Sequence, residues 1–344
     1  PPGSEIIFPA YTFHPMPLAA AERGLKPVFA DVDRKTWNIQ PEKIIPLINK
    51  KTKIIVPTHL FGVPAEMGAI NELAREHHLF VIEDCAHALG AMYGDTMVGN
   101  FGDAAVFTFA MSKNLPCWGG GAVVVKDTGL KETMERKLSV RPIPSSRSIF
   151  RRQLSNVFAL IATQPAFFSW TLYPALRAAD FLESDFFDKP FLEEIESPER
   201  RVKEGEGIIR IAPLQTATGL RQLKRFPDWL KRQKENAQFL RAELTDCSKI
   251  RLQGEPPGTR STFLYVRGRV KHPDKIRRKL LRAGIDTKPD DMRNCAGIDF
   301  FDISEPCPNT EFLGGHCIEI PCSPFYSHRQ IQKIAGAIRK ELIT

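Results

Sequence analysis

Two stretches of the chain carry side chains that could do chemistry. The first is Val81-Ile-Glu-Asp-Cys-Ala-His87, and the second runs from Phe107-Thr-Phe through Lys113-Asn114 to the glycines 119–121. Each stretch begins with an apolar run typical of a buried strand and ends in polar or charged residues. Open α/β sheets bind their ligands beyond the carboxyl ends of the strands. A lysine amine, a carboxylate and an imidazole are therefore expected to meet at one edge of a sheet.

This set of groups looks like a pyridoxal phosphate (PLP) site. Lys113 would form a Schiff base with the cofactor aldehyde, Asp84 would face the pyridine nitrogen, and His87 would lie against the ring. A carboxylate beside that nitrogen favours its protonated form and so keeps the ring an electron sink. Asp84 follows four residues of buried type, where an ionised carboxylate needs a partner. For His87, a packed or capping histidine is the structural alternative.

Several segments, in this order and spacing, resemble the DegT-type (DegT/DnrJ/StrS) sugar aminotransferases of PLP fold type I. The resemblance implies transamination of a keto-sugar, usually nucleotide-linked, with glutamate as amino donor, for amino-sugar and cell-surface glycan biosynthesis. It also implies a homodimer whose active sites lie at the subunit interface. The segments are Phe8–Phe13, Pro27–Asp33, Pro57–Gly62, Glu83–Gly90, Val98–Ala105, Arg210–Leu223, Arg232–Leu244 and Ile318–Pro324.

The resemblance adds further cofactor-binding residues to Lys113, Asp84 and His87. Thr108 matches a hydroxyl that contacts the cofactor phosphate, although a β-branched residue is also at home in a strand. Asn114, next to the lysine, and Arg210, near the start of a long helix, complete the predicted set. His87 matches a position held by Gln or His that stacks on the ring. No metal ligands are predicted.

The chain departs from the family pattern at two places near the substrate. The expected Gly-Tyr-Asn before Arg210 reads Gly207-Ile208-Ile209, so the asparagine that reaches the neighbouring subunit's phosphate is replaced. After Gly284-Ile-Asp-Thr287, where the family often has His or Tyr for the sugar, the chain continues Lys-Pro-Asp-Asp-Met-Arg-Asn. The substrate end of the pocket is expected to differ. The resemblance further implies that an earlier strand and helix, with a Gly/Ser/Thr-Ala turn for the cofactor phosphate, precede residue 1.

Hydrophobic patterning predicts the fold class. Between residues 5 and 126, short apolar runs alternate with helical patterns, which predicts an α/β structure with a mostly parallel, doubly wound sheet. Pro41 and Pro64 are expected to begin two of the helices, because proline is tolerated in the first turn. The predicted strands are 6–8, 28–30, 54–56, 79–82, 104–109 and 122–125.

The chain is expected to divide into two domains. Residues 1–212 would form the PLP-binding large domain, and residues 213–344 a smaller α+β domain that begins with one long helix from Pro213 to about Leu244. The predicted elements that follow are a strand at 262–266, a helix at 273–283 ended by Gly284, a strand at 317–320 and an amphipathic helix at 328–342.

An atypical apolar helical insertion is predicted at about 146–205. Its segment 154–176 has no charged residue and is bracketed by arginines, and its length could cross a bilayer. Pro165 and Pro174 instead favour two buried or interfacial helices. Two alternatives stay open: packing in a protein interface, or peripheral contact with an anionic membrane.

Composition excludes several protein classes. The 344 residues, 42% hydrophobic and 26% charged, are ordinary for a folded globular protein. The net charge of +8 and pI of about 9.1 favour anionic partners, but no basic module with interleaved aromatics predicts nucleic acid binding. Seven cysteines without CxxC spacing argue against a disulfide framework or zinc cluster. A reducing cytoplasm is expected, with the inner face of the membrane as the alternative.

Three other functions compete with a soluble aminotransferase. A PLP-dependent deoxysugar dehydratase typically has histidine at the Schiff-base position, and Lys113 argues against it. A catalytically idle family member could serve as a regulator or scaffold. A membrane-surface aminotransferase could act on a lipid-linked sugar.

Overall fold

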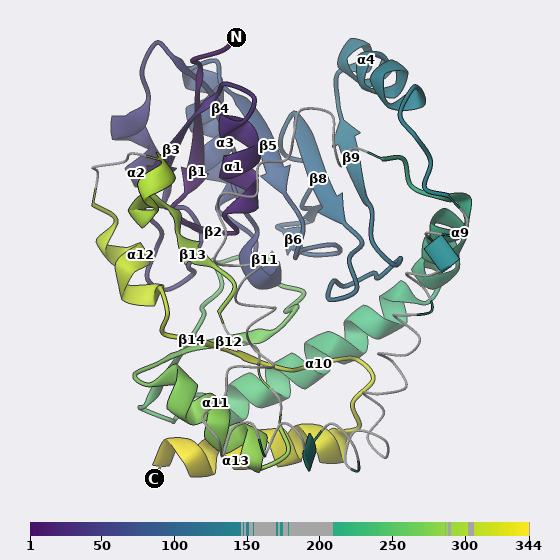
Figure 1. Ribbon diagram of the computed structural model, residues 1–344. Helices are drawn as coiled ribbons and strands as arrows, with labels where there is room; N and C mark the ends of the chain where they lie inside the picture. Colours follow the sequence, from purple (N-terminus) through teal and green to yellow (C-terminus); the bar gives the residue numbers. More distant parts are fainter. Residues whose placement is uncertain are drawn as a thin grey trace.

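The computed structural model describes residues 1–145, 209–285, 287, 290–301 and 306–343, together with 147, 149, 150, 154, 170, 173, 174 and 178. Its centre is a six-stranded sheet in the order β3-β1-β4-β5-β8-β9, in which only β9 runs antiparallel (Figure 1). All six predicted strands are confirmed. Their bounds are β1 Glu5–Pro9, β3 Lys26–Ala30, β4 Thr52–Ile55, β5 Phe80–Asp84, β8 Ala104–Thr108 and β9 Gly121–Val125.

Strands β1, β4 and β5 of the central sheet contribute apolar side chains to cores on both of its faces, whereas β9 at the edge leaves Val123 and Val124 about half exposed. Ile7 of β1 packs in one core with α3, while Ile6 and Phe8 pack in a second core on the opposite face. The helices of this part are α1 Pro15–Ala21, α2 Pro41–Ile44, α3 Met67–Glu76 and α4 Thr128–Ser139, and the 3-10 turns are Ile45–Leu47 and Leu60–Gly62. This two-faced burial is the reason that the strands read as continuous apolar runs.

The helix expected from Pro64 begins three residues later, at Met67. Residues 63 to 65 are held outside the helix by other contacts. The Asn38 side-chain amide donates to the carbonyls of Val63 and Pro64 (2.9 and 3.0 Å), and the Ala65 amide donates to His59 Nδ1 (3.0 Å).

A second, antiparallel sheet lies at the carboxyl-terminal end of the chain, in the order β10-β12-β14 (Figure 1). Its core comes from residues 237–342 and includes side chains of α10, α11 and α13. The predicted boundary after residue 212 stays a prediction. The elements are α9 Pro213–Leu223, α10 Phe226–Leu244, β10 Ile250–Leu252, β12 Val266–Val270, α11 Pro273–Arg282, α12 Pro308–Leu313, β14 Cys317–Ile320 and α13 His328–Ile343.

Short strands join distant parts of the chain. Strand β13 (Arg293–Asn294) pairs with β2 (Tyr11–Thr12), beside the end of β1. Cys295 and Cys307 pack against Phe8 in the core on one face of the central sheet. The remaining elements are β6 Met92–Tyr93, β7 Thr96–Met97, β11 Thr259–Arg260 and the 3-10 turns Cys295–Gly297 and Asp299–Phe301.

Two elements differ from the sequence expectations. The single helix expected over 213–244 is broken at Lys224 and Arg225, because Pro227 lacks an amide for the carbonyl four residues earlier and its ring would clash there. The strand expected at 262–266 begins only at Val266. Phe263 has a left-handed φ of 51°, which a strand does not accept, and its neighbours bond to the loop that carries Phe61 and Gly62.

The predicted helix at 273–283 is confirmed, and Gly284 ends it with a φ of 79°. The predicted insertion and its apolar segment lie almost wholly outside the described residues. Among the helices of the described part of the chain, none has the length and apolarity that a membrane span requires.

Candidate active site

Asp84 ends β5 at the carboxyl edge of the central sheet and is 4% exposed. Its backbone is held on both sides, since its amide donates to Pro57 O (2.8 Å) and its carbonyl accepts from the His59 amide (3.0 Å). Burial raises the pKa of the Asp84 carboxyl, whereas the Ala86 amide and the positive charge of Lys113 act to lower it. The carboxylate is thus a buried group that a cationic partner would stabilise.

Lys113 lies in the loop between β8 and β9, the last two strands of the sheet. The ends of this loop are tied together, because the Phe109 amide donates to Gly120 O (2.8 Å) and Phe109 O accepts from the amides of Cys117 and Gly119 (2.9 and 3.1 Å). Cys117 is buried and packs with α10. Lys113 therefore lies on a closed loop near Asp84. Its positive charge partly offsets the rise in the pKa of Asp84 that burial causes.

Asn114 and Thr108 complete this edge. Both amide atoms of the Asn114 side chain are buried without a hydrogen-bond partner in the part that the structure describes. Thr108 ends β8, and its hydroxyl lies 3.5 Å from Gly120 O. A buried amide that lacks partners costs free energy, so Asn114 fits a site that is completed by a polar ligand.

His87 is 7% exposed and stacks on Phe61, with ring centroids 5.3 Å apart and planes 14° apart. Its Nδ1 accepts a hydrogen bond from the Phe61 amide (3.2 Å). Phe61 itself adopts a left-handed φ of 56°. Both interpretations of His87 therefore remain: it is packed against Phe61, and it lies three residues beyond Asp84, where a cofactor ring would bind.

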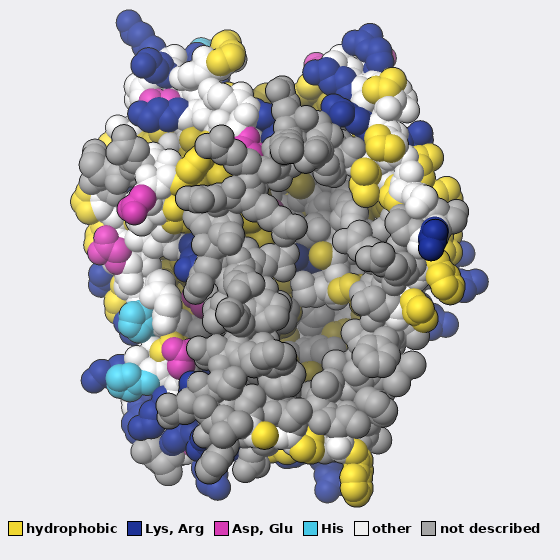
Figure 2. Space-filling model, in the orientation of Figure 1, with side chains coloured by type: hydrophobic (Ala, Val, Ile, Leu, Met, Phe, Trp, Pro, Cys, Tyr) yellow, Lys and Arg dark blue, Asp and Glu magenta, His cyan; other side chains and the backbone are white. Residues whose placement is uncertain are grey.

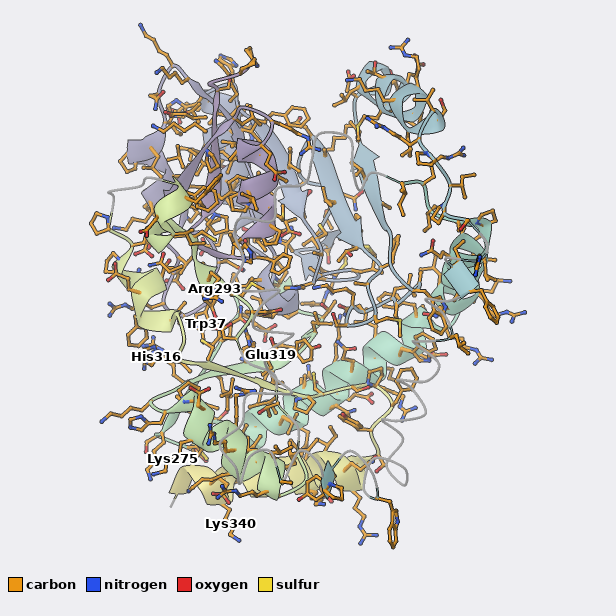
Figure 3. The ribbon with its side chains drawn as sticks, in the orientation of Figure 1. Trp37, Lys275, Arg293, His316, Glu319 and Lys340 are labelled. Carbon is orange, nitrogen blue, oxygen red and sulfur yellow. The ribbon has the colours of Figure 1, made fainter. Side chains whose placement is uncertain are left out.

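The Phe61 ring also contacts Arg267, whose Cζ lies 3.7 Å from the ring centroid. Arg267 is fully buried on β12 and pairs with Asp290 Oδ1 (2.6 Å) and with Glu319 Oε1 (2.9 Å). Glu319 lies on β14 (Figure 3). Tyr11 donates to the other oxygen of Asp290 (2.6 Å). Burial alone would lower the pKa of Arg267, but the carboxylates of Asp290 and Glu319 outweigh it and raise that pKa.

Sequence reasoning missed this buried cluster of Tyr11, Arg267, Asp290 and Glu319. The local signal was an arginine between valines in a strand, which alone does not identify a partner. The sequence did single out the region of Asp290 as different from the family. The structure shows that Asp290 is committed to Arg267 and Tyr11.

The structure places Arg210 apart from the other predicted residues. Its side chain is exposed and, among the described residues, makes no hydrogen bond or ion pair with another site residue. It lines a cavity of about 1090 Å³ beside β9 and α4, together with Gln215. Gln215, buried at 7% exposure, ties α9 to the glycine turn by donating to the carbonyls of Trp118 and Gly119 (3.2 and 3.3 Å).

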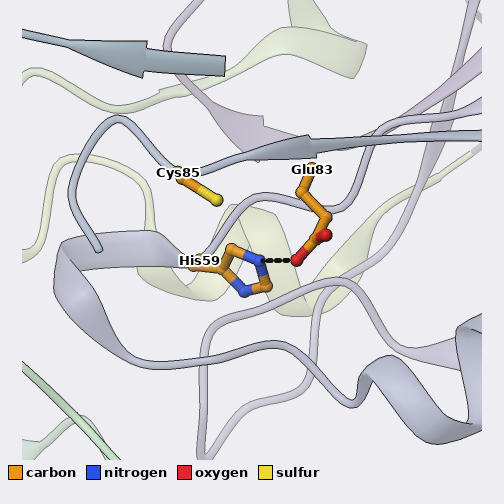
Figure 4. A group of neighbouring side chains, drawn as sticks. All are labelled: His59, Glu83 and Cys85. Carbon is orange, nitrogen blue, oxygen red and sulfur yellow. Dashed lines mark hydrogen bonds and ion pairs between the residues drawn. The ribbon is translucent and has the colours of Figure 1, made fainter. Parts of the chain in front are cut away.

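His59, Glu83 and Cys85 form a buried group, in which Glu83 and Cys85 flank Asp84 in the sequence (Figure 4). His59 Nε2 is 3.1 Å from Glu83 Oε2, and His59 Nδ1 accepts from the Ala65 amide (3.0 Å). Glu83 also accepts from the amides of Gly99, Phe101 and Gly102 at 2.7 to 2.8 Å. These bonds occupy the histidine nitrogens and both carboxylate oxygens, so the group ties loops to β5 and is not assigned as a metal site.

The residues at the sheet edge fit PLP. Asp84 offers a buried anion for the protonated ring nitrogen, Lys113 an amine for the aldehyde carbon, and Asn114 an unpaired amide. Of the predicted set, the structure groups Asp84 with Lys113 and brings His87 to Phe61, but it joins neither group to Arg210.

Comparison with known proteins agrees with this fold. The chain matches the DegT/DnrJ/EryC1/StrS aminotransferase family over residues 1–157 and 200–339. It is 34% identical over 236 residues to the spore coat polysaccharide biosynthesis protein SpsC of Bacillus subtilis (strain 168), which is 69% of this chain and 50% of SpsC. It is 46% identical over 138 residues to the UDP-N-acetyl-3-dehydro-alpha-D-glucosamine 3-aminotransferase of Acidithiobacillus ferrooxidans, which is 40% of this chain and 36% of that protein.

The solved structure of Helicobacter pylori PseC, an aminotransferase involved in the biosynthesis of pseudoaminic acid, superimposes with a TM-score of 0.75 at 23% identity. That alignment covers 99% of this chain and 80% of PseC. The chain spans half or less of the length of the curated relatives described above. The extent of the family match and the shared fold lead to one conclusion: the chain belongs to the DegT/DnrJ/EryC1/StrS aminotransferase family and has the PLP fold type I.

Proposed function

We propose that this protein transaminates a keto-sugar carried on a nucleotide, using PLP and an amino-acid donor, which we take to be glutamate. The observation that carries the proposal is the buried Asp84 carboxylate under the influence of Lys113, with the unpartnered Asn114 amide beside the lysine. The relative from Acidithiobacillus ferrooxidans is named for a 3-dehydro sugar on UDP, and SpsC for polysaccharide biosynthesis. Both names favour a sugar substrate.

When bound, PLP would supply an electron sink that stabilises the carbanion left after a proton leaves the donor Cα. Asp84 would bind the ring nitrogen and hold a proton on it, because the buried carboxylate gains a cationic partner there. Lys113 Nζ would hold the cofactor at its aldehyde carbon. Its free amine would serve as the general base that takes the proton from the donor Cα and as the general acid that returns it.

His87 and Asn114 would position the ring. The hydrogen bond from the Phe61 amide fixes one nitrogen of His87 and so sets the plane of the imidazole. Asn114 would satisfy its buried amide on polar atoms of the ligand. Both residues would also limit access of water to the reacting carbon, which favours transfer to the sugar over hydrolysis.

At the sugar end, Asp291 is the candidate recognition group. Its Oδ1 is buried without a hydrogen-bond partner among the described residues and lies 3.9 Å from Arg267 Nη2. Asp290 is already bound by Arg267 and Tyr11, so it would position its neighbour and would not contact the substrate directly. We infer that Asp291 accepts a hydrogen bond from a hydroxyl of the sugar in place of the family's His or Tyr.

The test is the half-reaction of the intact protein. With PLP bound, glutamate should convert the visible absorbance of the lysine-bound cofactor to that of pyridoxamine phosphate, and a panel of nucleotide-linked keto-sugars should reverse the change. Glutamine serves as an alternative donor. A protein that binds no PLP, or that binds it and converts no amino donor, would instead be an idle family member.

The same reaction on a lipid-linked sugar is a second candidate, favoured by one observation. Trp170, within the apolar segment, is 86% exposed, and Tyr173 of the same segment donates to the carbonyl of Arg282 (3.0 Å) at the end of α11. An exposed tryptophan beside a basic helix is typical of interfacial membrane binding. The lipid-linked form of the substrate panel distinguishes the two.

A further inference from the structure

A concave basic site lies on the carboxyl-terminal sheet and shares no residue with the candidate active site. We call it the basic pocket. It has a volume of about 680 Å³ and is bounded by β10, the end of β12, α11 and the end of α13. Figure 3 shows Lys275 at this end of the molecule, far from the central sheet, and Figure 2 shows Lys and Arg side chains gathered there. Six Lys and Arg side chains line it: Lys249, Arg251, Arg269, Lys271, Lys275 and Lys279.

The positive charge of the basic pocket is poorly compensated. Its single carboxylate, Glu341, pairs with Lys279 (3.1 Å). The side chains of Arg251, Lys271 and Lys275 make no hydrogen bond or ion pair in the portion of the chain that the structure describes. On an ordinary solvated face, charged side chains point away from one another. Here several cations face one cavity, which concentrates the positive potential there.

Two arginines of the pocket oppose each other directly. In the ladder between β10 and β12, Arg251 is the register partner of Arg269, and like charges in that position destabilise a sheet. Burial and the charges of Arg251 and Arg34 lower the pKa of Arg269. Arg269 is held in place by Phe312, since its Nε donates to Phe312 O (2.7 Å) and its Cζ lies 3.6 Å from the ring centroid. A bound anion would remove this repulsion.

The amino-acid sequence concentrates charge here. Residues 249–282 contain only two acidic residues, Glu255 and Asp274. The same stretch contains the basic residues Lys249, Arg251, Arg260, Arg267, Arg269, Lys271, Lys275, Arg277, Arg278, Lys279 and Arg282. Six of these eleven basic residues line the pocket, which contains a single carboxylate.

We infer that the basic pocket binds a phosphate-bearing anion. Arginine forks and lysine ammonium groups are the side chains that recognise phosphate oxygens in proteins. The apolar side chains of Val270, Ile276 and Leu342 also line the pocket and would contact an organic portion of the ligand. The volume lies in the range of small-molecule sites, about 300–1000 Å³. Two sources share this chemistry: a soluble phosphorylated compound and the headgroup of an anionic phospholipid.

The test uses the intact, PLP-loaded protein, so that the cofactor phosphate site is already filled. Inorganic pyrophosphate is titrated by calorimetry at low and high salt. The double variant Lys271→Ala/Lys275→Ala should weaken binding about tenfold or more, because it removes two unpaired cations. The matched control, Lys43→Ala/Lys53→Ala, removes two exposed lysines far from the pocket and should bind like the wild type.

Vesicles distinguish the two sources. Sedimentation with vesicles of phosphatidylglycerol and phosphatidylcholine, against phosphatidylcholine alone, measures binding to a headgroup. Saturable binding of one pyrophosphate per chain supports a soluble ligand, and vesicle binding without saturable pyrophosphate binding supports a lipid. Either kind of binding supports the proposal only if the Lys271→Ala/Lys275→Ala variant loses that binding. Equal binding by the variant and the wild type, or no binding to either probe, overturns it.

A measurement of transamination distinguishes failure of this proposal from failure of the proposed function. Neither Lys271 nor Lys275 belongs to the candidate active site, so the double variant should convert PLP with glutamate at the wild-type rate. Failure of that half-reaction in the wild type would count against the proposed function and leave the binding result intact.

Discussion

At the scale of single residues, the main feature of the candidate site is the buried carboxyl group of Asp84. Asp84 is buried at the end of β5, and burial raises the pKa of its carboxyl. Before PLP binds, the stability that Asp84 contributes is therefore greatest below its unfolded pKa of about 3.9 and is lost as the pH rises through its folded value. A protonated cofactor nitrogen would reverse this cost at neutral pH.

Lys113 should carry the cofactor. We expect PLP to bind with visible absorbance and borohydride reduction to fix it on Lys113, as peptide mapping would show. Lys113→Ala should keep the fold and lose transamination by at least about a hundredfold, because both the covalent attachment and the proton transfer are removed. Lys126→Ala, an exposed lysine at the opposite edge of the sheet, is the control. Mapping of the reduced cofactor to another lysine would refute the assignment.

Asp84→Asn should reduce kcat about a hundredfold or more, equivalent to ~2.7 kcal/mol of transition-state stabilisation, because an amide no longer favours the protonated ring nitrogen. The cofactor-free variant should melt at or above the wild-type temperature at pH 7, since a buried ionised carboxylate has been removed. His87→Gln should have a smaller effect on kcat. Wild-type turnover by Asp84→Asn would show that the ring nitrogen binds elsewhere.

At the scale of secondary-structure elements, buried polar groups join segments that hydrophobic packing alone would leave independent. Glu83 ties β5 to the loop at 99–102 and, through His59, to the loop before α3. Arg267 ties β12 to β14, to Asp290 and to the Phe61 ring on which His87 stacks. Because these elements converge beside Asp84, changes in either group should reach the active site.

Glu83→Gln should make stability less dependent on pH. Burial would raise the pKa of Glu83, but hydrogen bonds from His59 and from the amides of Gly102 and Gly99 outweigh it and lower that pKa. Its stabilisation is thus present above the unfolded value of about 4.3 and is lost as the pH falls through the folded value. Urea unfolding from pH 7 to pH 3 should show a smaller loss of stability in the variant, with exposed Glu135→Gln as the control.

Arg267→Met should cost about 3–5 kcal/mol of unfolding free energy, because Asp290 and Glu319 would remain buried without their counter-ion. Urea denaturation would measure it. The exposed Arg221→Met on α9 should change stability by less than about 0.5 kcal/mol. In the folded fraction, Arg267→Met should also alter the absorbance of bound PLP, because Phe61 loses a contact that supports His87. A variant as stable as Arg221→Met would mean that the cluster contributes little.

At the scale of the whole molecule, the open question is what covers the exposed apolar side chains. Phe150 is 66% exposed, Leu154 58% and Trp170 86%. Contiguous apolar surface mostly marks a protein interface or a membrane contact. A homodimer interface is the prediction that follows from the family, and an anionic membrane is its rival.

Liposome flotation should separate these alternatives. Binding to anionic vesicles that weakens in high salt and is lost when Phe167, Phe168 and Trp170 are changed to Ser would support a lipid-linked substrate, because apolar area and basic flanks both contribute to interfacial affinity. A dimer without affinity for vesicles would assign the segment to a protein interface and favour a soluble nucleotide sugar. Val140→Ser/Ile143→Ser, at two exposed apolar residues outside the segment, is the control.

The amino-acid sequence by itself determined the strands of the central sheet, the ends of several helices and the positions of Asp84, Lys113 and Asn114. Local patterns encode these features: six apolar runs bounded by turns became β1, β3, β4, β5, β8 and β9, and Gly284 supplied the positive φ that ends α11. Pro227 also encodes the break between α9 and α10, which the apolar spacing by itself does not reveal.

Only the tertiary structure decided which partners these residues have. Tyr11 and Asp290 are 279 positions apart in the chain. Arg267 contacts Phe61, which lies far before it in the sequence, and Glu319, which lies far after it. Short-range periodicity contains no information about such pairs. The left-handed backbone at Phe61 and Phe263, which joins the two loops, is likewise a non-glycine conformation that local propensity does not predict. Both side chains are buried there, Phe61 in a cluster with Tyr11 and Trp37 and Phe263 in the core of the carboxyl-terminal sheet.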